Sequence, residues 1–209
     1  MMPVVTVKQF MKPGFLEKIV RNSVAVADSA DRIIKRRIAG LKGVAMQQFD
    51  RHPITRELQQ GPSSTNSSGT LGGTGNLFSF IGFYSSTDPI GPVREILKSN
   101  LNLVSGQKKI RGTNGVQAFR YALSMPTLDS FNLVARMPWE SGNSWVVGIE
   151  RGISGFSNYM YFTRGEGRFA ERSRSGKAVQ SRKEINAGSF SPVKYITEVL
   201  DDYRKRLVG

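Results

Sequence analysis

The sequence contains no cysteine, and His52 is its only histidine. Disulfide bonds, zinc–thiolate sites and cysteine nucleophiles are therefore excluded, and a lone imidazole cannot supply the paired ligands of a histidine metal site. No run approaches eighteen apolar residues, so no membrane-spanning helix is expected, and residues 1–10 lack the apolar centre of a signal peptide. These absences argue against most enzyme chemistry and against a membrane-embedded protein.

Acidic residues are also scarce. Sixteen Asp and Glu stand against thirty Lys and Arg, which gives a formal net charge of +14. Such a charge attracts nucleic acid, an anionic membrane surface or an acidic protein, although a basic chain can also simply be solvated. The 209 residues are 39% hydrophobic and 10% aromatic, enough for one core, so a single domain over residues 1–209 is expected.

The first quarter of the sequence predicts one long helix. After an N-terminal arm over residues 1–13, apolar residues recur at helical spacing from Phe15 to Phe49, which predicts an amphipathic helix over residues 14–51. A helix of this length spans about 50 Å, so one end is expected to project or to lie along a neighbour. Gly40 and Gly43 are poor helix formers and indicate a kink or a close helix crossing.

A segment rich in Gly, Ser, Thr and Asn follows over residues 61–75 and predicts a flexible loop. The next residues, NLFSFIGFY over 76–84, have the composition of a strand with apolar side chains on both faces. Because both faces need covering, we expect them to contact the core or another subunit rather than to stack on nucleic-acid bases. The residues expected at a subunit interface are Leu71, Asn76, Leu77, Phe78, Phe80 and Phe83.

The remaining elements predict an α+β fold, in which an antiparallel sheet packs against the long helix and a C-terminal helix. Residues 76–163 are expected to form this sheet together with short helices that begin after Asp88 and Ser144. Alternating side chains predict that Phe119, Tyr121 and Leu123 share the buried face of one strand. The expected strands cover residues 76–84, 101–104, 108–111, 116–124, 131–137 and 158–163.

The C-terminal helix is predicted over residues 191–208. Ser191 is a suitable N-cap and Pro192 suits the first helical position, while Phe190 and Tyr195 can meet as a hydrophobic staple. Before this helix, residues 164–190 predict an exposed basic arm, which is either a solvated loop or a surface that contacts phosphates without reading bases. Its basic residues are Arg164, Arg168, Arg172, Arg174, Lys177, Arg182 and Lys183.

Motifs with catalytic associations have simpler explanations. GEGRFA over residues 165–170 matches a dinucleotide-binding pattern, but charged residues follow it in place of the apolar helix that such a site needs. Ser191 and Lys194 have the spacing of a nucleophile and an amine base, yet capping and solvation account for both. We therefore predict no catalytic, cofactor-binding or metal-binding residue, and no enzyme.

Two stretches resemble the neck and tail-completion proteins of tailed bacteriophages. Residues 74–77 (Thr-Gly-Asn-Leu) stand where that family has a short loop before its first strand, and Phe190, Pro192 and Tyr195 resemble the start of its final helix. The order of elements is also similar over most of the chain. The insertion over residues 137–156 and the basic arm have no counterpart in the family that we can place.

The resemblance implies a structural virion protein. It implies a homo-oligomeric ring, most simply a hexamer, placed in the neck or at the end of the tail between the connector and the tail tube or sheath. Double-stranded DNA would pass through its lumen, and the basic residues of the arm would face this DNA channel or a partner. Assembly would take place in the host cytoplasm, without cofactors or a membrane partner. The alternative is a basic nucleic-acid-binding protein that contacts phosphates through residues 164–183.

Overall fold

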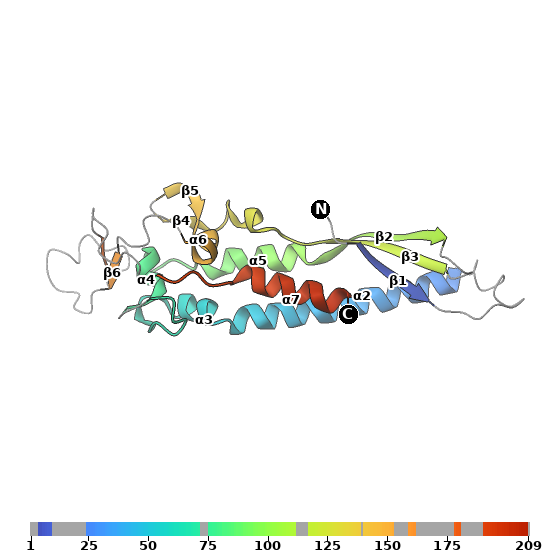
Figure 1. Ribbon diagram of the computed structural model, residues 1–209, viewed down its shortest axis with the longest axis horizontal. Coiled ribbons are helices and arrows are strands. Elements are labelled where there is room, and N and C mark those ends of the chain that lie inside the picture. Colours follow the sequence, from blue (N-terminus) through green and yellow to red (C-terminus); the bar gives the residue numbers. More distant parts are fainter. Residues whose placement is uncertain are drawn as a thin grey trace, which may run out of the picture.

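The long axis of the molecule follows one helix. The computed structural model describes residues 4–9, 24–71, 75–111, 117–138, 140–152, 159–161, 178–180 and 190–208, and the fold is α+β as predicted. Figure 1 shows that helix α2 (Val24–Arg51) runs along much of an elongated molecule and that α7 (Ile196–Val208) lies beside it. A three-stranded sheet covers the N-terminal half of α2 at one end, and the short helices lie toward the other end.

Helix α2 confirms the long amphipathic helix from Val24 onward, while residues 14–23 of that prediction lie outside the described residues. Its buried side chains follow helical spacing and face the core. Gly40 and Gly43 lie within the uninterrupted helix, both exposed, and a Cβ added at either would meet no atom within 4 Å. Neither glycine therefore marks a close crossing with another described helix. The buried side chains of α2 are Ala30, Ile34, Ile38, Ala45 and Phe49.

The larger sheet is antiparallel and has the order β1-β3-β2. Phe119, Tyr121 and Leu123 of β3 (Gln117–Ser124) are at most 1% exposed, which confirms the predicted buried face. The two strands predicted over 101–104 and 108–111 form one continuous strand, β2 (Asn102–Arg111), with register shifts between Leu103 and Lys108. Within the N-terminal arm predicted over 1–13, residues 4–9 form strand β1 (Val4–Gln9), whose β-branched composition suits its antiparallel pairing with β3.

The short helix predicted after Asp88 is confirmed: the Asp88 carboxylate accepts hydrogen bonds from the backbone N–H groups of Ile90 and Gly91, each at 3.0 Å. A helix also follows Ser144 as predicted. The strand predicted over 131–137 is wrong, because a 3-10 helix and a turn occupy most of it. The elements not yet given bounds are α3 (Pro53–Gln60), η1 (Gly61–Ser63), α4 (Leu77–Ile81), α5 (Ile90–Asn100), η3 (Leu128–Phe131), β4 (Arg136–Met137), β5 (Glu140–Ser144), α6 (Trp145–Arg151), β6 (Tyr159–Tyr161) and β7 (Ala178–Gln180).

Helix α7 begins at Ile196, so the helix predicted over 191–208 is wrong for its first five residues. Those residues instead bond to other segments, since the Ser191 N–H donates to the carbonyl of Thr70 at 2.9 Å and the Val193 N–H donates to that of Ile149 at 3.0 Å. At the other end of α7, Arg37 donates to the Arg206 carbonyl at 3.0 Å. This contact satisfies a carbonyl that a helix end leaves without an internal partner.

Candidate functional site

The predicted aromatic strand over 76–84 is wrong, and the residues that we expected at a subunit interface lie in the core of the chain itself. Residues Leu77–Ile81 form the short helix α4. Phe80 stacks on Phe190 with ring centroids 5.9 Å apart, and Phe83 meets Trp145 edge-on, also at 5.9 Å. The six residues are therefore not exposed for contact with another subunit, because Leu71, Asn76, Leu77, Phe78, Phe80 and Phe83 are all 8% exposed or less.

A buried carboxylate begins helix α4. Glu57 of α3 has no exposed surface, and its two oxygens accept hydrogen bonds from the Leu77 N–H at 2.5 Å and the Ser68 N–H at 2.8 Å. Asn76 is the N-cap: its side-chain oxygen accepts from the Ser79 N–H at 2.8 Å. Its amide group donates back to the carbonyls of Pro62 and Ser64. Two side chains thus bind the loop to the helix that follows it.

Residues 61–71 of the predicted flexible loop form hydrogen bonds with one another and with Glu57; residues 72–74 lie outside the described residues. The Asn66 amide group donates to the Leu71 carbonyl at 2.6 Å, and Leu71 forms a β-bridge with Phe190. Thr70 is 1% exposed. Glycine and serine give this segment the turns it needs, and buried side-chain partners take up its backbone polar groups.

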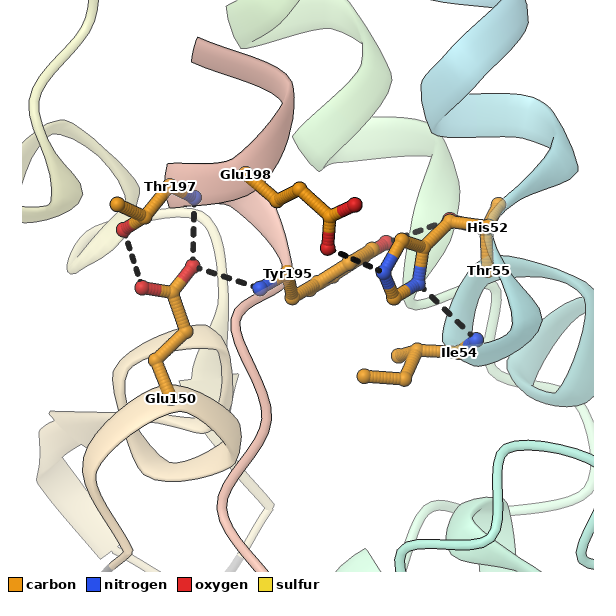
Figure 2. A network of polar contacts seen from close by, with 7 residues as sticks. All are labelled: His52, Ile54, Thr55, Glu150, Tyr195, Thr197 and Glu198. Carbon is orange, nitrogen blue, oxygen red and sulfur yellow. Dashed lines mark hydrogen bonds and ion pairs between the residues drawn. The ribbon is translucent and has the colours of Figure 1, made fainter. Parts of the chain in front are cut away.

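The second polar site joins α2, α3, α6 and α7 (Figure 2). Tyr195 is fully buried; its hydroxyl shares a 2.8 Å hydrogen bond with that of Thr55, and its ring lies 4.8 Å from the ring of His52. Burial raises the pKa of Tyr195, so the hydroxyl keeps its proton at neutral pH. The predicted pairing of Phe190 with Tyr195 gives way to different neighbours, because Phe190 stacks on Phe80 and Tyr195 stacks on Phe49.

Glu150 caps α7 from a distant part of the chain, as Figure 2 shows. Its carboxylate accepts hydrogen bonds from the N–H groups of Tyr195 at 3.3 Å and Thr197 at 2.7 Å, and from the Thr197 hydroxyl. Negative charge at a helix N-terminus is stabilising, since the N–H groups there have no partner within the helix. Glu57 and Glu150 therefore perform the same task at two different helix starts.

His52 is the N-cap of α3, and its imidazole is held in the neutral form. Its Nδ1 accepts a hydrogen bond from the Ile54 N–H at 3.3 Å, which places the ring proton on Nε2, 3.9 Å from a Glu198 carboxylate oxygen. Burial lowers the pKa of His52 below its ordinary value of 6.5, and the carboxylates of Glu198 and Glu150 oppose this only in part. Protonation would also remove the acceptor that α3 uses.

We expect the free energy of unfolding to fall as the pH drops below about 6.5. In that range His52 binds a proton in the unfolded chain more readily than in the folded one, because its pKa is lowered by burial in the fold. The stabilisation is complete above the pKa of the unfolded chain and is lost as the pH falls toward the lowered folded pKa. His52→Asn keeps a capping acceptor without titrating. Urea unfolding at pH 7.5 and 5.5 should show a smaller pH effect in this variant; an equal loss in both proteins would contradict the assignment.

Within the predicted basic arm, residues 178–180 form β7, which pairs with β6, and Phe190 is also described. The basic residues of the arm all lie outside the described residues: Arg164, Arg168, Arg172, Arg174, Lys177, Arg182 and Lys183. Positive charge also gathers elsewhere, at a site that the sequence reading missed. The three strands of the larger sheet and residues 24–42 of α2 hold ten basic and two acidic residues, whereas the other described residues hold ten of each. Among the described residues, the end that carries the sheet in Figure 1 is therefore the more basic one, and it is called the basic end below.

Of the residues weighed for catalysis or cofactor binding, Ser191 and Lys194 are described, whereas residues 165–170 lie outside the described part of the chain. Ser191 and Lys194 are both exposed, and the Ser191 backbone bonds to Thr70. Across the described parts of the chain, no three carboxylate or imidazole side chains are placed to hold a metal ion. Nor is any helix among those residues long and apolar enough to cross a membrane.

Comparisons of the chain with protein-family models, curated proteins and solved structures found no match. The resemblance to phage neck and tail-completion proteins therefore stays a prediction that rests on residues 74–77 and 190–195.

Proposed function

We propose that this chain is a structural subunit of a tailed-phage virion, which assembles into a ring in the neck or at the end of the tail around the DNA channel. One observation carries the proposal. Residues on either side of the first similar stretch (74–77) pack against the second (190–195), through the Leu71–Phe190 bridge, the Ser191–Thr70 hydrogen bond and the stacking of Phe80 on Phe190. Two regions over a hundred residues apart in sequence are thus brought together in one packed unit.

The chemistry of the buried polar groups also supports a structural role. The side-chain oxygens of Glu57, Asn76 and Glu150 all accept hydrogen bonds from backbone N–H or hydroxyl groups of the same chain. A carboxylate used in this way stabilises local structure and is not left free to act on a substrate. Contacts between subunits would then use exposed side chains, and large apolar ones occur on α2 (Ile33, 63% exposed) and α7 (Val208, 83% exposed).

Light scattering after size-exclusion chromatography, followed by negative-stain imaging, tests the proposal on the full-length chain. We expect a stable closed ring, most simply of six subunits, because a surface patch that meets a different patch on the next copy closes into a ring when the rotation permits. A protein that remains monomeric at micromolar and higher concentrations would contradict it.

A further inference from the structure

Five basic residues lie within a single stretch of α2, from Arg32 to Lys42, without an acidic residue among them. Four of the five are engaged with other groups, and the bond of Arg32, to Ser29, is described below. Arg37 binds carbonyls at the end of α7, Lys42 donates to the Asn102 side chain at 2.8 Å, and Lys35 pairs with Asp31 at 3.6 Å. Arg32 and Arg36 are exposed, one helical turn apart, and point away from the buried stripe.

A shallow hollow lies beside these two arginines. It has a volume of about 490 Å³ and is lined by Ser29, Arg32, Ile33, Arg36 and Arg37. Within it, the Arg32 guanidinium donates to the Ser29 hydroxyl at 3.3 Å, and no hydrogen bond or ion pair joins Arg36 to another described residue. The hollow is therefore lined by the guanidinium groups of Arg32 and Arg36 beside that of Arg37, and its lining contains no carboxylate.

We infer that this face of α2, with Arg32 and Arg36 at its centre, binds the phosphodiester backbone of double-stranded DNA. Guanidinium groups suit phosphate oxygens because their planar donors bond in pairs. The surrounding charge favours the same ligand, since the basic end holds eight more positive than negative residues, whereas the rest of the described chain is balanced. Contacts of this kind position a protein on DNA without reading its sequence.

The same surface is poorly suited to a membrane. A helix that lies on a bilayer needs a broad apolar face turned toward the lipid, and the apolar face of α2 is packed in the core. Ile33 is the one large apolar side chain in the lining of the hollow. The inference goes beyond the proposed function and does not need it, because the surface belongs to a single chain whether or not that chain forms a ring.

The test is binding of the full-length chain to a fluorescent 30-base-pair duplex, measured by anisotropy at several salt concentrations. The variant R32Q/R36Q removes both arginines but keeps Arg37 and its hydrogen bond to the end of α7. R56Q/R136Q is the matched control, because these arginines are exposed, outside the basic end, and their removal changes the charge equally. A third variant, R168Q/R172Q/R174Q/K177Q, tests the arm. Thermal unfolding midpoints show whether each variant folds.

We expect R32Q/R36Q to bind about thirtyfold to a hundredfold more weakly than the unchanged protein at 0.1 M salt, and the slope of log affinity against log salt to decrease by about 1.8. The control should lose less than about threefold. The inference is overturned if the unchanged protein does not bind the duplex, if both double variants lose affinity equally, or if only the arm variant loses it. Preference for anionic lipid vesicles over the duplex would overturn it as well.

Discussion

Glu57→Gln should lower the free energy of unfolding by about 2–4 kcal/mol, although it changes one atom. An amide has a single acceptor oxygen, so one of the two N–H groups, that of Leu77 or that of Ser68, would face an NH₂ group in a site without solvent exposure. A buried donor that loses its acceptor costs about 1–3 kcal/mol, and hydrogen bonds to a charged group contribute more than neutral ones. Urea unfolding followed by circular dichroism measures the change.

Glu95→Gln is the matched control for this substitution. Glu95 is on the exposed side of α5, where its side chain is 68% exposed and forms a surface ion pair with Lys98 at 3.7 Å. Exposed pairs of this kind contribute little, so we expect a loss below about 0.5 kcal/mol. Equal midpoints for Glu57→Gln and Glu95→Gln would show that the buried carboxylate does not hold the loop and α4 together.

Tyr195→Ala should be still more damaging, with an expected loss of about 3–5 kcal/mol. The ring is completely buried, and its centroid lies 5.9 Å from that of Phe49, 4.8 Å from that of His52 and 6.4 Å from that of Trp145. Removing it opens a cavity between α2, α6 and the start of α7. The same unfolding experiment measures the loss, and a change below about 1 kcal/mol would contradict the packing.

Two further variants separate the ring from its hydroxyl. Tyr195→Phe keeps the packing but leaves the Thr55 hydroxyl without its partner, so we expect a loss of about 1–2 kcal/mol. Combined with Thr55→Val, the two substitutions should be less than additive, because both remove the same hydrogen bond. Tyr84→Ala serves as the exposed control: Tyr84 is 57% exposed, and we expect little change.

Helix α2, the buried face of β3 and the apolar stripe of α7 could be predicted because each buries one side only. One-sided burial leaves a period of 3.6 or 2 residues in the sequence, and that period survives without knowledge of the neighbours. Helix α4 has no such period. All five of its residues are buried, so every position is apolar or small, and its composition imitates a strand.

The local signals of α4 lie at its ends rather than in its middle. Asn76 is a favoured N-cap, and Gly82, with φ of 84°, takes the left-handed conformation in which helices commonly end. A capping residue at 76 and a glycine at 82 are the spacing of a short helix, so giving these ends more weight than the strand-like composition between them would have predicted the helix. Glu57 could also have been singled out from the sequence, because it is an acidic residue beside Ile54 and Leu58 on the apolar face of α3, where a carboxylate needs buried hydrogen-bond donors.

Other parts of the site left no local signal. Glu150 caps a helix that begins forty-six residues later. The residues around Tyr195 and Thr197 in the sequence give no indication that their N–H groups donate to Glu150. Ser191 and Pro192 were a plausible helix start on their own, but hydrogen bonds to Thr70 and Ile149 draw the backbone away from helix. Long-range partners of this kind follow from the tertiary fold and not from propensity.

The contacts of Ile149 and Gly152 with residues 192 and 193 bear on how far the stretch between them can change in length or charge. Val193 bonds to Ile149, and a Cβ placed on Gly152 would lie 3.4 Å from Pro192, so the core holds both ends of the intervening stretch, residues 153–189, close together. Joining two ends that are already neighbours costs little more for a long connection than for a short one. Changes in the length or charge of that stretch that leave β6 in contact with α4 should therefore cost the core little, so a different neighbour can be accommodated there without redesigning the fold.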